Sequence, residues 1–353
     1  MKEFLQRHRI GLTTLVVLLL VLYVLQPARD SVQMHEFGGG TMGTTYSVKV
    51  VDEREQASGE LLALEIGELL RHLDRDVMST YSEDSELTEI NKAAVGENLS
   101  ISREMAEVLT LALEINALTD GAFDVTVGPL VNRWGFGPEA RRSDRIPSQE
   151  EIDGLLARVG SQYLELDAEG LTLRKTGDVY IDLSGIAKGY AVDQLAHYLD
   201  GRGFSNYFIE VGGELRIRGY KPGNQSWVPA IEKPVDTAPQ VHNIFYARGE
   251  PIAVAGSGDY RNYFDQDGVH YSHEIDPVTG RPVTHLLAAT YVIDAEAARA
   301  DALATAFMVM GTDKAFALAE RIGLAAYFIS KRPNGVGFDD RYTSGFAHYL
   351  SAD

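Results

Sequence analysis

A carboxylate and a hydroxyl stand four residues apart in the segment Ala300–Ala306, at Asp301 and Thr305, among small apolar residues. Side chains four residues apart lie on the same face of a helix, so these two oxygen-bearing groups would point the same way. Such oxygens suit a hard cation when a backbone carbonyl and phosphate oxygens complete the site. The alternative is a pair that only caps a helix, and the spacing leaves both interpretations open.

A second cluster, Asp182–Tyr190, combines a carboxylate at the end of an expected strand, a tight turn and the start of an expected helix. The free backbone N–H groups of a helix N-terminus favour an anion such as a phosphate. Lys188 falls in the first helical turn, where the helix macrodipole disfavours a positive charge. That placement favours a role for Lys188 toward a ligand, and the segment suits a phosphate or a metal.

Polar groups also crowd one turn in the segment Ser272–Pro282, where His273, Asp276 and Thr279 follow Ser272 closely. Histidine changes its charge near neutral pH, which makes it the usual proton carrier in enzymes. A single histidine of this kind is more often structural than catalytic, so the turn is a candidate site for proton transfer and no more.

Three further segments are candidates for binding an aromatic or sugar-containing ligand. In Asp120–Leu130, Asp124 lies beside an aromatic residue and suits hydrogen bonds from a ribose or a purine edge, or a turn cap. Tyr81 follows an expected helix and suits stacking on an aromatic ligand, or packing on the core. The small residues of Thr41–Tyr46 let the backbone approach a ligand closely, although a glycine-rich strand entry explains them equally well.

Hydrophobic periodicity predicts the elements that must position these groups. Strands are expected at 44–51, 163–167, 171–175, 179–183, 207–211, 215–220, 227–231, 252–255, 260–265, 287–294 and 324–330, and helices at 59–78, 103–118, 148–159, 186–199 and 295–322, the last broken near Gly311. Adjacent strands mixed with unevenly placed helices favour an α+β fold over a regular doubly wound sheet. Ser148 and Glu151 have the spacing of a capping box that opens the helix expected at 148–159. The stretch Gly135–Pro147 is either an internal boundary or a long loop.

Composition narrows the class of protein. A chain of 353 residues with 45% hydrophobic content is long enough to bury a substantial core. The excess of 51 acidic over 32 basic residues argues against a nucleic-acid binder. The chain has no cysteine, which excludes disulfides, thiolate metal sites, thiol nucleophiles and an acylated lipoprotein cysteine.

The N-terminal region predicts a membrane anchor. Residues 10–28 carry no charged side chain, and a helix of that length spans about 28 Å, close to the hydrocarbon thickness of a bilayer. Lys2, Arg7 and Arg9 precede it and only Arg29 follows closely. The positive-inside rule therefore places the tail in the cytoplasm and the rest of the chain across the membrane.

A cleaved signal peptide is the competing interpretation of this region. The stretch Gln26–Ala28 is a poor cleavage site, so an uncleaved anchor is favoured. We therefore expect, in a bacterial inner membrane, a cytoplasmic tail at residues 1–9, a transmembrane anchor at 10–28, a linker at 29–37 and one periplasmic domain at 38–353.

Five segments, taken together and in this order, resemble the signatures of the ApbE family, the FAD:protein FMN transferases. They are Thr41–Thr44, Gly121–Thr126, Asp182–Gly189, Ser272–Pro277 and Asp301–Thr305. One such match is weak, but five in sequence are specific, and the resemblance covers nearly the whole body from Gly38 to Ile329. It implies an α+β flavin transferase fold related to the T-fold.

The same resemblance implies an activity. Members of the family transfer FMN from FAD onto a threonine hydroxyl of a partner protein, with Mg²⁺ as cofactor and AMP as the leaving group. Family acceptors are flavin-carrying subunits of membrane redox complexes, such as the sodium-translocating NADH:quinone reductase and the Rnf complex. Attack on the FMN-side phosphorus needs a neutralised diphosphate and a positioned nucleophile, and needs no covalent enzyme intermediate.

Residue by residue, the resemblance also implies a site. The expected FAD contacts are Met42, Tyr81, Ala122, Phe123, Asp124, Asp182 and Lys188. The expected magnesium ligands are the Gly185 carbonyl, Asp301 and Thr305, with the Ala304 carbonyl as a further candidate. His273 is the expected group that activates the acceptor hydroxyl, and Asp182 or Asp276 are alternatives between which the sequence does not decide.

Two other functions share these features. An FAD pyrophosphatase would use the same metal and diphosphate but pass FMN to water, and the sequence barely separates it from a transferase. A flavin-binding envelope protein without turnover is the second alternative. The Asp301–Thr305 pair argues against it, because simple retention of a flavin needs no metal.

Overall fold

The computed structural model of the protein describes residues 32–53, 58–137, 146–260, 262–266 and 268–351. The predicted cytoplasmic tail and transmembrane anchor lie outside these residues. Within the described ranges, no helix has the length and apolar character needed to cross a membrane.

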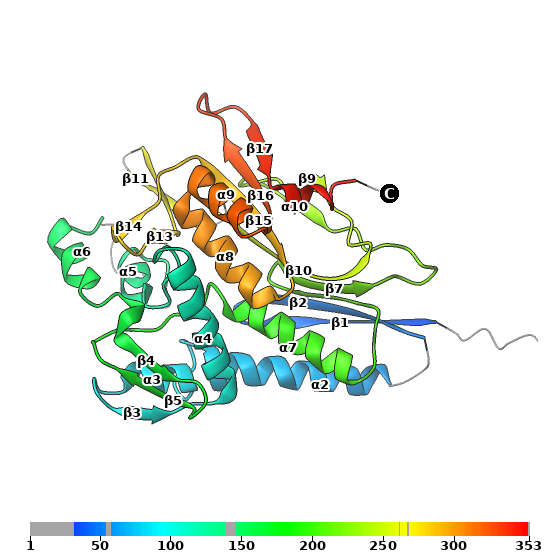
Figure 1. Ribbon diagram of the computed structural model, residues 1–353, viewed down its shortest axis with the longest axis horizontal. Coiled ribbons are helices and arrows are strands. Elements are labelled where there is room, and N and C mark those ends of the chain that lie inside the picture. The colour runs from blue at the N-terminus through cyan, green and yellow to red at the C-terminus, as the bar shows by residue number, and fades with distance from the viewer. Residues whose placement is uncertain (1–31, 54–57, 138–145, 261, 267, 352–353) are drawn as a thin grey trace, which may run out of the picture.

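The centre of the fold is an eight-stranded sheet in the order β1-β2-β6-β7-β10-β15-β16-β17 (Figure 1). Its strands are β1 (Gln33–Thr41), β2 (Thr44–Asp52), β6 (Tyr207–Val211), β7 (Glu214–Gly219), β10 (Gly249–Gly258), β15 (Leu287–Asp294), β16 (Ala325–Lys331) and β17 (Phe338–Tyr342). Every neighbouring pair runs antiparallel. Successive side chains of a strand face opposite sides of the sheet, so Tyr207, Ile209 and Val211 of β6 share one buried face.

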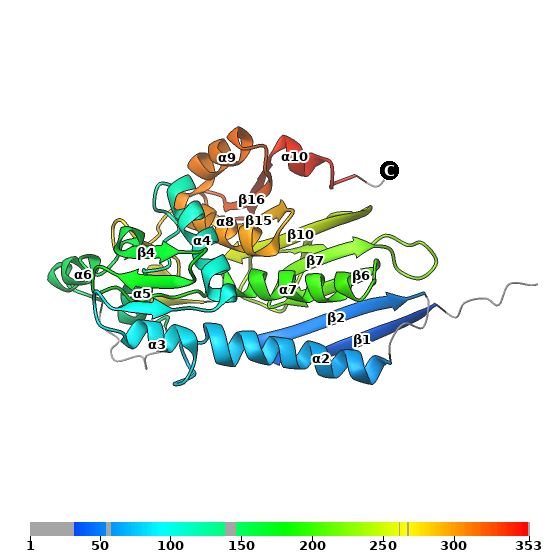
Figure 2. The same cartoon turned by 60° about the horizontal axis from the view of Figure 1, so that its bottom comes forward.

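The longer helices pack on one face of this sheet, as Figure 2 shows from below, whereas the short C-terminal helix packs on the other face through Phe346. The helical elements are α2 (Gly59–Arg71), the π-helical turn η1 (His72–Met78), α3 (Glu86–Lys92), α4 (Arg103–Leu118), α5 (Gly128–Arg133), α6 (Gln149–Leu156), the 3-10 turn η2 (Ser161–Tyr163), α7 (Ala187–Gly201), α8 (Ala297–Met310), α9 (Thr312–Arg321) and α10 (Ser344–Ala347). α7 packs against β6 and β7, and α8 packs against β10, β15 and α7.

Short strands surround the main sheet. They form the three-stranded sheet β3 (Asn98–Ser100), β5 (Thr172–Lys175) and β4 (Leu164–Asp167) and the pairs β8 (Ala230–Glu232) with β9 (Val241–Ile244), β11 (Tyr263–Gln266) with β12 (Val269–Ser272), and β13 (Ile275–Asp276) with β14 (Arg281–Pro282). A mixed α+β architecture is thus confirmed.

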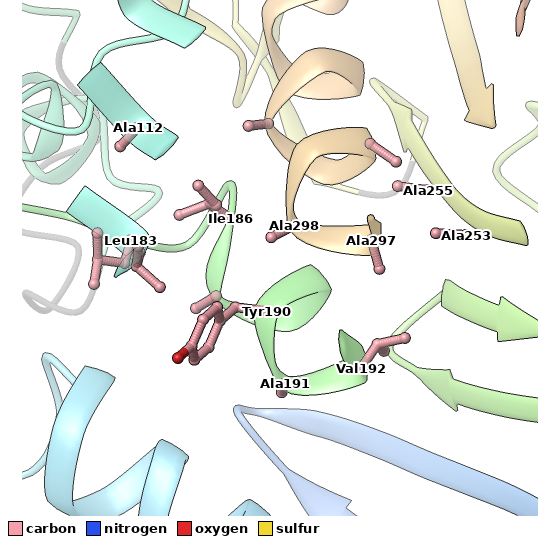
Figure 3. Close-up of a cluster of buried hydrophobic side chains, with 14 of the residues drawn as sticks. Ala112, Leu183, Ile186, Tyr190, Ala191, Val192, Ala253, Ala255, Ala297 and Ala298 are labelled. Carbon is pink, nitrogen blue, oxygen red and sulfur yellow. The ribbon is translucent and has the colours of Figure 1, made fainter. Parts of the chain in front are cut away.

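Small residues bring α7 and α8 unusually close together. Figure 3 shows Ala297 and Ala298, at the start of α8, near α7 and near Ala253 and Ala255 of β10. A side chain at Gly189 of α7 would overlap the Ala297 carbonyl, so only glycine permits this approach. The close packing sets the first turn of α7 beside the first two turns of α8, and both helices carry predicted site residues.

Several predicted elements agree closely with the structure. The helix at 103–118 is α4, the break near Gly311 separates α8 from α9, and Ser148 with Glu151 forms the capping box that opens α6. Gly311 has a φ of 76°, a conformation that suits glycine and ends the first helix.

The strand predicted at 179–183 is wrong, because the structure has no strand there. Its apolar residues are buried, but the side chain of Asn91 takes the place of a neighbouring strand. The Asn91 amide donates to the Ile181 carbonyl at 2.9 Å, and the Ile181 N–H donates to Asn91 Oδ1 at 2.7 Å. The next polar residue, Asp182, donates its own N–H to the Val125 carbonyl at 2.7 Å.

Strand β1 was not predicted. It begins at Gln33, within the segment expected to be a linker, and pairs with β2 along its full length. Three consecutive glycines, Gly38–Gly40, concealed the strand pattern, since glycine weakens the usual strand preference.

Candidate functional site

A cavity of about 520 Å³ lies among the turn before α7, α8, the start of β7, and the loops around Phe123 and His273. Most of the site residues expected from the sequence line it: Ala122, Phe123, Asp124, Asp182, Gly185, Lys188, His273, Asp301 and Thr305. The fold therefore brings together four of the five sequence segments that carried the family resemblance.

Four expected site residues lie outside the lining of this cavity. Met42 is in the β1–β2 turn, where its N–H donates to Asp74 Oδ2 at 3.0 Å. Tyr81 is 73% exposed, and Ala304 is fully buried in α8. Asp276 accepts hydrogen bonds from the Val278 N–H and the Thr279 hydroxyl and thereby caps the β13–β14 turn. Roles for these four in binding or catalysis stay predictions.

The position of Asp301 and Thr305 follows from the start of α8. Asp193 of α7 accepts hydrogen bonds from the N–H groups of Ala297 and Ala298, each at 2.9 Å, and so caps α8 across the helix pair. Burial raises the pKa of Asp193, and these two hydrogen bonds act against that shift. One turn into α8, Asp301 accepts the Gly189 N–H at 3.0 Å, which fixes its carboxylate against α7.

A lysine and two buried carboxylates meet at the base of the cavity. Lys188 Nζ lies 3.1 Å from Glu214 Oε1 and 3.6 Å from Asp301 Oδ2. Both carboxylate residues are only 2% exposed. Burial lowers the pKa of Lys188, but Asp301 and Glu214 more than offset this, and the net shift is upward. Lys188 is therefore an ammonium at neutral pH.

Glu214 was missed by the sequence reasoning, although its surroundings were visible. Gly212 and Gly213 form the turn between β6 and β7, with φ values of 62° and 110°, and Glu214 follows at once. A Cβ on Gly212 would lie 2.7 Å from Thr44 Cγ2 and 3.0 Å from Lys188 Cδ. A glycine pair between two predicted strands indicates such a turn. The acidic residue that follows the pair, Glu214, could therefore have been recognised as a candidate from the sequence.

The titration of Glu214 is strongly perturbed. Burial raises its pKa to about 8, while the ammonium of Lys188 acts in the opposite direction. Glu214 Oε2 is buried and has no hydrogen-bond partner among the residues described here. A buried carboxylate oxygen without a donor is costly, and it marks a place where the site is incomplete without a ligand.

The oxygen atoms at and around Asp301 suit the coordination of a magnesium ion. Thr305 and Gly185 are adjacent, because a Cβ on Gly185 would come within 3.2 Å of Thr305 Oγ1. Across the described ranges, no three histidine, aspartate or glutamate side chains converge on one point that could hold a metal. A site here would combine one carboxylate, one hydroxyl and a backbone carbonyl with oxygens from a ligand or water. Mg²⁺ is typically held in this way, through few protein ligands and substrate phosphates.

His273 lies directly after β12 and pairs with the next residue. Its Nε2 is 3.4 Å from Glu274 Oε1, and Glu274 is buried, which raises the pKa of that carboxyl group. The ring of Phe136 meets the imidazole edge-on, with centroids 6.2 Å apart. Nδ1 is buried without a hydrogen-bond partner in the described part of the chain. A carboxylate on one ring nitrogen leaves the other suited to accept a proton.

Asp124 holds its own loop together. Its carboxylate accepts hydrogen bonds from both the N–H and the hydroxyl of Thr126, from the N–H and hydroxyl of Ser161, and from the Asn116 amide. These donors fix the loop that carries Phe123 against the cavity. The contact between Asp124 and FAD implied by the resemblance stays a prediction.

Three further residues that line the cavity, Glu232, Tyr260 and Tyr291, were not among the site residues expected from the sequence. Tyr260 donates its hydroxyl to Glu232 Oε2 at 3.2 Å, and the Glu232 N–H donates to the Tyr291 hydroxyl at 2.9 Å. These contacts join β8 to the main sheet beside β10 and β15. The three residues lie far apart in the sequence, and no local motif predicts that they are in contact.

Comparisons with known proteins identify the family of the chain. Residues 42–328 match the model of the ApbE family. The chain is 43% identical over 343 residues to an FAD:protein FMN transferase of Vibrio cholerae, covering 96% of this chain and 98% of that protein. It is 38% identical to the FAD:protein FMN transferase of Escherichia coli, covering 93% of each.

Solved structures show the same likeness. The flavin transferase ApbE from Vibrio cholerae superposes with a TM-score of 0.82 at 42% identity, covering 90% of this chain and all of that one. The apo form of the Pseudomonas stutzeri flavinyl transferase ApbE also gives 0.82, at 39% identity, with 91% and 98% of the two chains covered.

Proposed function

Because the chain belongs to the ApbE family, we propose that it is a transferase that moves the FMN half of FAD onto a threonine hydroxyl of an acceptor protein, with Mg²⁺, and releases AMP. Flavin transfer from FAD to a protein is the activity named in the similar proteins. The threonine, the metal and the identity of the acceptor are the finer parts of this proposal.

One observation supports the chemistry most directly. The Lys188–Asp301 pair, the Thr305 hydroxyl and His273 all line a single cavity. An ammonium beside a candidate cation site suits a diphosphate, and a carboxylate-paired imidazole suits an attacking hydroxyl. Phosphoryl transfer needs chiefly this positioning and charge neutralisation.

The proposed step conserves atoms and charge. The threonine oxygen bonds to the FMN-side phosphorus, the bond from that phosphorus to the bridging oxygen breaks, and AMP leaves with that oxygen. His273 takes the threonine proton at Nδ1, while Glu274 holds the ring through Nε2. Lys188 neutralises charge on the diphosphate. Bound at Asp301, Thr305 and the Gly185 carbonyl, Mg²⁺ would supply Lewis-acid stabilisation of the phosphate oxygens.

The setting of the reaction is also a proposal. The uncharged segment 10–28, with basic residues before it, supports an anchor in a bacterial inner membrane and a catalytic body on the periplasmic side. In that position the acceptors would be flavin-carrying subunits of membrane redox complexes, of the sodium-translocating NADH:quinone reductase or Rnf type.

The test is covalent labelling of an acceptor. The full-length protein is mixed with FAD, Mg²⁺ and a candidate acceptor subunit, and flavin fluorescence is sought on a denaturing gel. We expect a fluorescent acceptor band that needs Mg²⁺ and disappears with Asp301→Ala. The matched control is Asp313→Asn, an exposed change in α9 that should leave the band unchanged.

Other outcomes would contradict the proposal. Release of free FMN and AMP without a labelled acceptor would instead support an FAD pyrophosphatase. Intact bound FAD after tests with several acceptors would support a flavin-binding protein without turnover.

A further inference from the structure

The ammonium of Lys188 forms ion pairs with two carboxylates, of which only one is expected to bind the metal. Asp301 lies beside Thr305 and Gly185 and is the expected metal ligand, whereas Glu214 stands on the β6–β7 turn. The distances are unequal, at 3.1 Å to Glu214 and 3.6 Å to Asp301. Lys188 is thus held more closely by the carboxylate that is not expected to bind metal.

This arrangement matters once a divalent cation is present. An ion on Asp301 and the ammonium of Lys188 would both draw on the same carboxylate, and like charges repel strongly where water is excluded. Without a second anion, the lysine would compete with the cation for Asp301. Glu214 is the other carboxylate within ion-pair distance of Lys188 among the described residues.

The fold places Glu214 in a buried position beside the lysine. It is the first residue of β7, follows two glycines with positive φ, and is 2% exposed. Gly212 also allows the Lys188 stem to pass close by, since a Cβ there would lie 3.0 Å from Lys188 Cδ. The turn therefore positions the carboxylate and the lysine stem together.

We propose that Glu214 is a positioning residue that shares the Lys188 ammonium with Asp301 and so leaves Asp301 available to a divalent cation, which lets the lysine and the cation act on the same diphosphate. This inference rests on the proposed metal-dependent function. It assigns Glu214 an effect that passes through Lys188 and involves no bond to the metal.

The competing explanation is that Glu214 acts on the metal directly, through its unpartnered Oε2. A double-mutant cycle separates the two. If the effect passes through Lys188, replacing Glu214 matters only while the ammonium is present. If Glu214 acts on the metal itself, the loss is the same whether or not Lys188 is present.

The experiment measures Mg²⁺ affinity by calorimetry, on the full-length protein without FAD, at about pH 8.5, above the raised pKa of Glu214. The variants are Glu214→Gln, Lys188→Met and the double variant. The matched control is Glu210→Gln, which changes a carboxylate of the same hairpin whose partner is the Gly213 N–H. It lies outside the cavity lining.

We expect Glu214→Gln to weaken Mg²⁺ binding about tenfold or more, since one buried charge is removed beside the ammonium. Glu210→Gln should stay within about twofold of the parent, and Glu214→Gln should have no further effect in the Lys188→Met background. An unchanged affinity in Glu214→Gln, or an equal loss in both backgrounds, would overturn the inference.

Two further measurements keep the test decisive. If Glu214→Gln does not fold, as judged by circular dichroism, Glu214→Asp replaces it and should give a smaller loss that again depends on Lys188. In turnover, Glu214→Gln should raise the Mg²⁺ concentration for half-maximal rate more than the KM for FAD. If the parent labels no acceptor while the calorimetric pattern holds, transfer to a protein is contradicted, whereas the effect of Glu214 on cation binding through Lys188 is supported.

Discussion

Asp193 Oδ1 accepts a hydrogen bond from the backbone N–H of Ala297 at 2.9 Å, so a carboxylate of α7 caps the first turn of α8. The same helix carries Asp301 four residues further on. The geometry of the candidate metal site therefore depends on a contact between helices that are about a hundred residues apart in sequence.

We predict that Asp193→Ala lowers the free energy of unfolding by about 2 kcal/mol, because two helix N–H groups lose their buried acceptor. Mg²⁺ affinity should fall as well, since the start of α8 is no longer fixed against α7. Chemical denaturation and calorimetry measure the two effects. Asp193→Asn retains one acceptor and should lose less of each, and equal losses in both variants would contradict the explanation.

The pH dependence of stability should carry the signature of Glu214. Its pKa in the folded protein is raised to about 8 by burial, above the value of 4.5 for an unperturbed glutamate. Between these values the folded protein keeps a proton that the unfolded chain releases, so stability falls as pH rises through this window.

The matched comparison is the parent against Glu214→Gln, both free of metal. We expect the difference in free energy of unfolding to decline by up to about 1.4 kcal/mol per pH unit within the window and to level off above about pH 8. Added Mg²⁺ should flatten the curve, because a nearby cation favours the ionised carboxyl group. A difference that is independent of pH would show that Glu214 titrates normally.

Because His273 pairs with Glu274, we predict that substitutions at either residue lower the transfer rate without weakening FAD binding. Glu274→Gln should lower the transfer rate about 10- to 100-fold, and His273→Gln should lower it about 100-fold or more, with FAD affinity nearly unchanged. A time course of acceptor labelling measures the transfer rate, and a titration with FAD measures the affinity. His348→Gln, an exposed histidine paired with Glu250, is the control and should behave like the parent. Normal transfer by His273→Gln would exclude the histidine as the proton acceptor.

Gly212 and Gly213 offer a test of close packing at the cavity base. Both have positive φ, so alanine at either position costs about 1 kcal/mol of backbone strain. Only at Gly212 would the new Cβ meet Thr44 and Lys188, since nothing lies within 4 Å of a Cβ at Gly213. Gly212→Ala should therefore destabilise the protein more and also weaken FAD binding, whereas Gly213→Ala should affect stability alone. Equal FAD affinities would show that the lysine stem tolerates the displacement.

Local patterns predicted the parts of the fold that depend on neighbours in sequence. The periodic helix α4, the capping box at Ser148 and the helix break at Gly311 all follow from short-range chemistry. The segment 179–183 failed for the opposite reason. Its alternating apolar residues are buried, but their backbone partner is Asn91, about ninety residues away.

The site residues fall into the same two groups. Those with a local signal in the sequence were predicted, and those that depend on contacts across the fold were missed. Asp301, Thr305 and Lys188 were found because their spacing or helix position is unusual, and the cavity brings them together. Glu214 and Asp193 were missed because their importance comes from contacts across the fold, with Lys188 and with the start of α8. Asp124 was found by position, yet its carboxylate proves to be occupied by donors from its own loop and from Ser161.

The most direct test of the central claim is the intact mass of an acceptor subunit after incubation with the full-length protein, FAD and Mg²⁺, with released AMP measured in the same sample. We expect the acceptor mass to increase by one FMN less one water, with one AMP formed for each acceptor modified and no modification when its threonine is replaced by valine. An unmodified acceptor in the presence of stoichiometric free FMN and AMP would contradict the assignment of a protein hydroxyl as the acceptor.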